Sequence, residues 1–180
     1  MPIKDVLLPL LSAVLLGAAA PAQAAQGAIC LTRPEAESVV QVLLPDVLVA
    51  AGGVCAGYIP PQSVLRDPQG PVIMRFRADA AAAWPGARAV VQRLAPPEMA
   101  GLVNNDLLRT VLTAALAPAI AGNIKPADCP TFDRVVNLLS PLPARNIAAL
   151  LVEFNVLGTK NGKSPIPICG VTPPPPAGRP

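Results

Sequence analysis

The most regular apolar pattern in the chain lies between two cysteines, over residues 32–53. Thr32 and Glu35 have the spacing of a capping box, in which each side chain satisfies a backbone N–H of the other residue. The pattern predicts an amphipathic helix that starts after Thr32, is kinked at Pro45 and ends in a left-handed turn at Gly52-Gly53. Apolar residues recur there at helical spacing and form one stripe: Val40, Leu43, Leu44, Val47, Leu48 and Ala51.

A second stretch, residues 72–79, fits two patterns. Its apolar residues alternate as in a strand, yet they also continue a helical face that extends to Leu94. The alanine run that follows, residues 80–83, favours helix. The sequence therefore predicts helices over Val72–Ala83 and Pro85–Leu94, interrupted at Trp84-Pro85-Gly86, while a strand at 72–79 stays open as the alternative.

Three further helical stripes follow in the second half of the chain. The first helix is capped by Asn104 or Asn105 and ends at Gly122, and Asp128 caps the second. The third runs from Ala144 to Leu157, and the short Pro-containing connection before it favours an antiparallel pair. The three stripes are, in order, Leu107, Leu108, Val111, Leu112, Ala115, Leu116, Ala119 and Ile120; Phe132, Val135, Val136 and Leu139; and Ile147, Leu150, Leu151, Phe154 and Leu157.

These elements predict an all-α fold, a single domain over residues 25–170. It contains five or six short Pro-interrupted helices, a core of small side chains and a short extended segment near the C-terminus, ending at Cys169. Residues 171–180 are a Pro-rich tail for which we expect disorder. No internal repeat or interdomain linker is evident.

Residues 1–24 have the organisation of a signal peptide. Lys4 supplies the positive start, an apolar stretch extends from Val6 to Ala20, and Ala22-Gln23-Ala24 matches the small-residue cleavage pattern. An uncleaved membrane anchor is the alternative, although about 15 apolar residues fall short of the roughly 20 that a bilayer requires. We therefore expect a periplasmic or extracellular protein after cleavage near Ala24. No later segment is apolar enough to cross a membrane without containing a proline or a charge.

The chain has four cysteines, Cys30, Cys55, Cys129 and Cys169, and all follow the leader. An even number of cysteines in an exported chain predicts two disulfides. A metal site of four thiolates is the alternative, but such sites usually contain C-x2-C pairs, and this chain has none.

The predicted first helix also constrains the pairing. A straight helix from Arg33 to Ala51 is about 28 Å long, whereas bridged cysteines have Cα atoms about 4.4–6.8 Å apart. The flanking residues can span only about 20 Å. Unless the helix breaks sharply at Pro45, Cys30 and Cys55 each pair with one of the distant cysteines, Cys129 or Cys169.

The side-chain chemistry argues against an enzyme. The chain has no histidine, which excludes Ser–His and Cys–His nucleophiles. No serine of the mature chain lies in an S-x-x-K or G-x-S-x-G motif, the patterns typical of catalytic serines. Most acidic residues fall at helix starts or turns, where we expect them to be structural; among them, Asp133 is predicted at the surface. Glu153 lies in mid-helix and is expected to face solvent. No metal and no cofactor is expected.

The net charge and the distribution of charged residues do not indicate a strongly charged partner either. Removing Lys4 and Asp5 with the leader leaves the formal net charge at +3, which is too small to indicate a nucleic-acid partner. Five arginines form a weak basic cluster that we interpret as a solvated helix face, with contact to anionic envelope lipids as the alternative. They are Arg66, Arg75, Arg77, Arg88 and Arg93.

Three function classes remain. We favour an exported, non-enzymatic protein that binds an envelope protein or has a structural role. The alternative is a carrier of an apolar small molecule or lipid, because short bent helices can leave a cavity between them. An enzyme is third, and only an enclosed pocket lined by two or more carboxylates would favour it.

Overall fold

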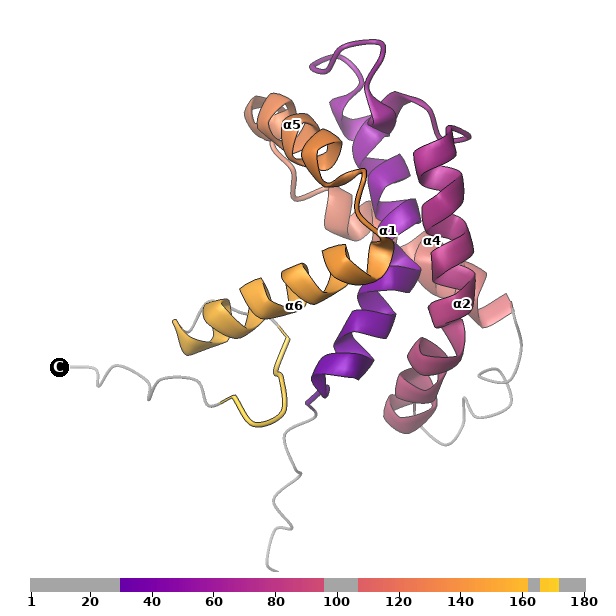
Figure 1. Ribbon diagram of the computed structural model, residues 1–180, viewed down its shortest axis with the longest axis vertical. Coiled ribbons are helices and arrows are strands. Elements are labelled where there is room, and N and C mark those ends of the chain that lie inside the picture. The colour runs from indigo at the N-terminus through magenta and orange to yellow at the C-terminus, as the bar shows by residue number, and fades with distance from the viewer. Residues whose placement is uncertain (1–29, 96–106, 162–165, 172–180) are drawn as a thin grey trace, which may run out of the picture.

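The long first helix, α1 (Arg33–Cys55), forms the centre of the structure, and α2, α4 and α6 all pack against it (Figure 1). The computed structural model describes residues 30–95, 107–161 and 166–171. Within these ranges the remaining elements are η1 (Val64–Arg66), α2 (Pro71–Leu94), α4 (Leu107–Ala121), η3 (Pro126–Asp128), α5 (Cys129–Leu139) and α6 (Ala144–Lys160). The predicted all-α domain is confirmed.

The capping box at the start of α1 is confirmed, but the predicted end of the helix is wrong. Thr32 N–H donates to Glu35 Oε2 at 2.8 Å, and Glu35 N–H donates to Thr32 Oγ1 at 3.4 Å. The helix continues through Pro45 and past Gly52-Gly53 to Cys55. Gly52 has a packing role instead of a stopping role, because a Cβ there would lie 1.9 Å from the carbonyl oxygen of Leu65.

The second helix, α2, is continuous, so the predicted interruption at Trp84-Pro85-Gly86 is wrong, as is the strand alternative for residues 72–79. Pro85 is exposed, and so is Ala81, whose carbonyl lacks the usual helical donor and can be hydrated. Gly86 allows close approach to α1, since a Cβ at this position would lie 2.6 Å from Ser38 Oγ. Both residues therefore fit within one continuous helix.

The helices of the second half largely match their predicted bounds. Helix α4 ends before Gly122 as predicted, while its predicted cap at Asn104 or Asn105 lies outside the described residues. Asp128 occupies the N-cap position of α5, but its side chain makes no capping hydrogen bond. Helix α6 extends beyond the predicted end at Leu157 to Lys160.

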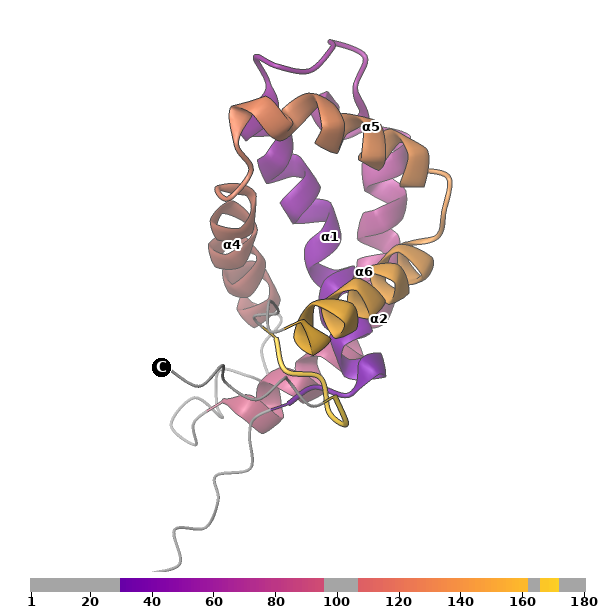
Figure 2. The ribbon, with the colours of Figure 1, turned by 90° about the vertical axis from the view of Figure 1, so that its left-hand side faces the viewer.

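The expected antiparallel pairing of α5 with α6 is wrong. Helix α5 packs on η1 and η3, whereas α6 packs on α1 and α2. The connection between them is held against α2, because the Arg75 guanidinium donates to the carbonyl oxygen of Ser140. In addition, Asp79 Oδ2 accepts the Ala144 N–H at 3.2 Å. Figure 2 shows α5 and α6 diverging from this connection on the same side of α1.

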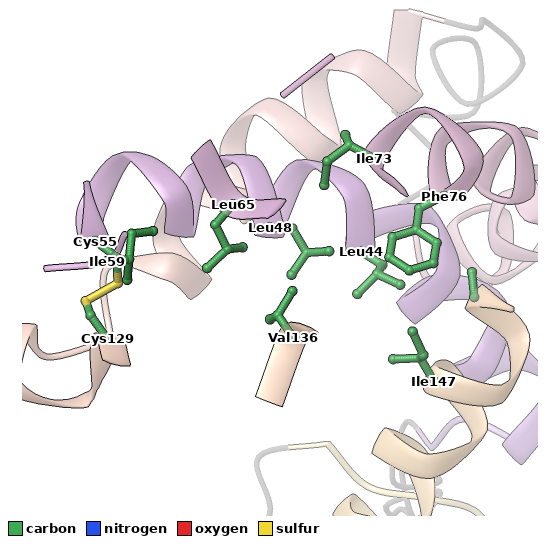
Figure 3. Close-up of a cluster of buried hydrophobic side chains, with 11 residues drawn as sticks. Leu44, Leu48, Cys55, Ile59, Leu65, Ile73, Phe76, Cys129, Val136 and Ile147 are labelled. Atoms are coloured by element: carbon green, nitrogen blue, oxygen red, sulfur yellow. A yellow bond between two sulfur atoms is a disulfide. The ribbon is translucent and has the colours of Figure 1, made fainter. Parts of the chain in front are cut away.

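The buried side chains form three clusters. The largest joins α1, η1, α2, α5 and α6, and Figure 3 shows Leu44, Phe76, Val136 and Ile147 converging on its centre. Trp84 anchors a second cluster between α1, α2 and α4. The third lies where the start of α1 meets α6 and the segment around Ile168.

The predicted extended segment near the C-terminus is present as a single parallel bridge between Leu31 and Ile168. Leu31 N–H donates to Pro167 O at 3.0 Å, and Cys169 N–H donates to Leu31 O at 2.9 Å. Val171, assigned to the tail in the sequence analysis, is partly buried against the third cluster. The leader and residues 172–180 lie outside the described residues.

Among the described residues, α1 is long and apolar enough to cross a membrane by length and composition, despite Pro45 and Asp46. Its most apolar 18-residue window has a mean hydropathy of 1.8, and 39% of that window is buried in the fold. Helix α4 with the η3–α5 segment qualifies too if the pair, bent by 89°, is counted as one span. Central helices of water-soluble proteins meet the same criterion.

Candidate functional site

All four cysteines are paired in disulfides. Cys30 is bonded to Cys169 and Cys55 to Cys129, with Cα–Cα distances of 5.1 Å and 5.5 Å. The prediction that Cys30 and Cys55 each pair with a distant cysteine is confirmed, for the reason given: the helix between them is long and unbroken. Two disulfides indicate an oxidising compartment outside the cytoplasm.

The acidic side chains are dispersed, and several of them have structural partners. Glu153 is exposed as predicted and pairs with Arg33 at 2.7 Å. Glu35 pairs with Arg93 at 2.9 Å, in addition to its place in the capping box. Within the described ranges, no three His, Cys, Asp or Glu side chains are grouped as metal ligands would be.

Glu35 gives the start of α1 a dependence on pH. The pKa of its carboxyl is lowered chiefly by the hydrogen bond from the Thr32 backbone N–H, then by the Thr32 hydroxyl and by Arg93, against an opposing effect of desolvation. A lowered folded-state pKa stabilises the fold above the ordinary value of 4.5, and this stabilisation is lost as the pH falls through the folded-state pKa. Urea unfolding should therefore show that Glu35→Gln lowers the free energy of unfolding at neutral pH, and that this difference shrinks as the pH falls below 4.5. A difference that grows on acidification would contradict this.

Asp133 is buried, so its predicted surface position is wrong. Its Oδ1 accepts the hydroxyl proton of Ser63, which is also buried, and Ser63 Oγ accepts the Leu65 N–H at 3.1 Å. This network links α5 to η1. The sequence could not reveal it, because the two partners lie 70 residues apart.

The Ser63–Asp133 contact gives a specific stability prediction. Ser63→Ala leaves a buried carboxylate oxygen without its donor and should lower the free energy of unfolding by about 1–3 kcal/mol. Asp128→Ala is the matched control, since Asp128 is exposed and makes no capping bond; its effect should stay within about 0.5 kcal/mol. Urea unfolding monitored by circular dichroism measures both, and equal effects would contradict the assignment.

Three of the five arginines of the predicted basic cluster have partners within the fold. Arg66 donates to the carbonyl oxygen of Ala56, Arg75 to that of Ser140, and Arg93 contacts Glu35. These three side chains therefore connect separate parts of the fold. All three side chains remain exposed, as expected for solvated arginines, and their contacts within the fold count against an anionic-lipid surface.

The divergence of α5 and α6 leaves an apolar groove of about 160 Å³ above α1. Every described residue that lines it has a hydrocarbon side chain. Helices α1 and α2 form its floor, and α5 and α6 form its two walls. The lining residues are Leu44, Val47, Leu48, Phe76, Phe132, Val135, Val136, Leu139, Ile147 and Leu151.

The apolar surface continues beyond the groove. Helix α6 buries its smaller apolar side chains, Ala148, Val152 and Val156. Its larger ones point outward: four of the five residues in the stripe identified from the sequence are exposed, namely Leu150, Leu151, Phe154 and Leu157. On α5, Leu138 is 70% exposed. Periodicity located the stripe but not its direction.

Helix α4 likewise exposes most of the apolar stripe that was expected to be buried. Its buried residues are Leu108, Thr113, Ala117 and Ala121, so only one member of the predicted stripe is buried. Four large members are exposed: Leu107, Val111, Leu116 and Ile120. Leu108 and, in part, Leu112 pack inward in the Trp84 cluster, while the other buried side chains of α4 are small.

A polar cleft of about 290 Å³ also lies between α1, α2 and the start of α6. Ser38, Gln41, Asp79 and Arg145 line it, but the Asp79 carboxylate already accepts the Ala144 N–H, and the Ser38 hydroxyl donates to Pro34 O. With one carboxylate, it is not the paired-carboxylate pocket that would favour an enzyme.

No known protein family, curated protein or solved structure matches this chain. The apolar groove is therefore the strongest functional candidate.

Proposed function

We propose that this protein is exported, loses its leader near Ala24 and acts as a non-catalytic binding protein in the cell envelope or outside the cell. The groove between α5 and α6 receives apolar side chains of an envelope protein. The observation that carries this proposal is the carbon-lined groove next to outward-facing large apolar residues. Contiguous apolar surfaces of this kind usually mark interaction sites.

The groove chemistry favours a helix as the docking element. An extended peptide has unpaired backbone N–H and C=O groups, and the lining side chains carry no hydrogen-bonding atom to pair with them. A helix satisfies its own backbone and presents only side chains. A groove of about 160 Å³ suits one or two anchoring side chains of such a helix.

Site-specific photocrosslinking tests the proposal. A benzophenone amino acid at Leu151, inside the groove, should give a discrete protein adduct in intact envelopes. The same probe at Tyr58, which is 55% exposed, follows the C-terminal end of α1 and does not line the groove, is the matched control and should give no adduct. Absence of any adduct from Leu151, with the protein at its native level, would refute protein docking.

A carrier of an apolar small molecule is the second candidate, favoured by the same hydrocarbon lining. An engineered cavity of about 150 Å³ is known to bind benzene, and the groove has a similar volume. Native mass spectrometry of the purified mature protein should then show a bound apolar molecule that is lost in Leu151→Gln. N-terminal sequencing of the same sample tests cleavage near Ala24.

A further inference from the structure

The groove and its protruding neighbours lie on one face of the molecule. Leu151 lines the groove, and Phe154, one helical turn further along α6, is 59% exposed. Val135 lines the opposite wall, and Leu138, one turn further along α5, is the most exposed large apolar residue of those described. The groove and the exposed side chains of Phe154 and Leu138 are thus adjacent.

We propose that the protein docked on this face is a second copy of the same chain. This inference rests on the proposed function of the groove as a protein-docking site. A two-fold axis beside Phe154 would place the Phe154 ring of each copy at the groove of the other copy. This is possible because the groove and the exposed Phe154 side chain are neighbours on one surface. Helix α6 would supply the docking helix that the groove chemistry favours.

The size of this face fits a dimer of moderate affinity. The exposed parts of Val135, Leu138, Leu150, Leu151, Phe154 and Leu157 amount to roughly 500–600 Å², taking about 150–200 Å² for each free side chain. A standard interface buries about 800 Å² on each partner, polar rim included. A two-fold pair would therefore approach the standard interface area.

The charge on α6 at this face does not oppose self-association. Between Leu150 and Leu157 of α6, the only charged residue is Glu153, and its carboxylate is paired with Arg33 at 2.7 Å on the same copy. Like charges are destabilising when they meet across a two-fold axis. Here the outward stripe is made of Leu150, Phe154 and Leu157 and would bring hydrocarbon against hydrocarbon.

Sedimentation equilibrium of the oxidised mature protein tests the proposal. We expect reversible dimerisation in the micromolar range, with Phe154→Ala raising the dimer dissociation constant at least ten-fold. Tyr58→Ala is the matched aromatic control, with similar exposure, and should leave the constant unchanged. Because both side chains are exposed, circular dichroism should show that each variant retains the helical fold.

Photocrosslinking at Phe154 supplies an independent readout. An adduct of twice the mature mass that contains only this chain supports the dimer. A protein that stays monomeric at about 100 μM, or dimerises equally well as Phe154→Ala, overturns it. A monomer whose Leu151 probe captures a different protein overturns the dimer but leaves the proposed function standing. A monomer that binds liposomes through Phe154 overturns both.

Discussion

Replacing Gly52 by alanine is expected to destabilise the fold by about 2–4 kcal/mol, although alanine is the better helix former. The added Cβ would lie 1.9 Å from the carbonyl oxygen of Leu65 and 2.9 Å from its carbonyl carbon. Both are backbone atoms, so no side-chain rotation can relieve the overlap. The η1 turn would have to move away from α1, disturbing the buried Leu65 and the neighbouring Ser63–Asp133 contact.

The neighbouring glycine provides the control. A Cβ at Gly53 meets nothing within 4 Å, and the residue is helical and exposed. Gly53→Ala should therefore stabilise the protein by up to about 1 kcal/mol through helix propensity alone. Opposite signs in urea or thermal unfolding are the expected result. Equal effects of the two substitutions would show that η1 does not press on α1.

Removing the Cys55–Cys129 disulfide should have the largest effect of all, about 4 kcal/mol or more. The bridge closes a loop with a sequence separation of 74, for which the chain-entropy model gives about 4 kcal/mol. Both cysteines are also 0% exposed and belong to the largest core cluster, so Cys55→Ala with Cys129→Ala loses packing as well. We expect a strongly lowered thermal midpoint, or no cooperative unfolding at all.

The other bridge provides the comparison. Cys30 and Cys169 are only half-buried, and they tie the two ends of the described fold together. While Cys55–Cys129 is intact, the Cys30–Cys169 bridge closes a loop nearly as long as that of Cys55–Cys129, so the chain-entropy model gives the two bridges similar contributions. Cys30→Ala with Cys169→Ala should still destabilise less than loss of the Cys55–Cys129 bridge, because the half-buried cysteines lose less packing. The reverse order in calorimetry would contradict this account of the core.

These predictions also separate stability from function. Gly52 and the Cys55–Cys129 bridge act on the fold, and neither lines the proposed docking groove. Phe154 and Leu138 are exposed, and their substitution should change association while leaving the unfolding transition nearly unchanged. A variant such as Leu138→Ala that lost both would indicate that the face belongs to the core of the monomer.

Local sequence rules were sufficient for several parts of this protein. The Thr32–Glu35 capping box depends on residues three apart, and the helical stripes depend on spacing within one element. The exclusion of a Cys30–Cys55 bridge was accessible for a related reason: a helix of known rise between these two cysteines is too long to let them meet. The all-α class and the non-local character of both bridges followed from these rules, whereas the choice between Cys129 and Cys169 for each partner did not.

The tertiary structure decided which way the stripes face and where backbones touch. Helix α6 is apolar on two sides, and periodicity cannot tell that Ala148, Val152 and Val156 would be buried while Phe154 would not. Gly52 resembles a helix stop in the sequence, but its role depends on Leu65 crossing α1. Direction and close approach are properties of pairs of elements distant along the chain, so only their packing could determine them.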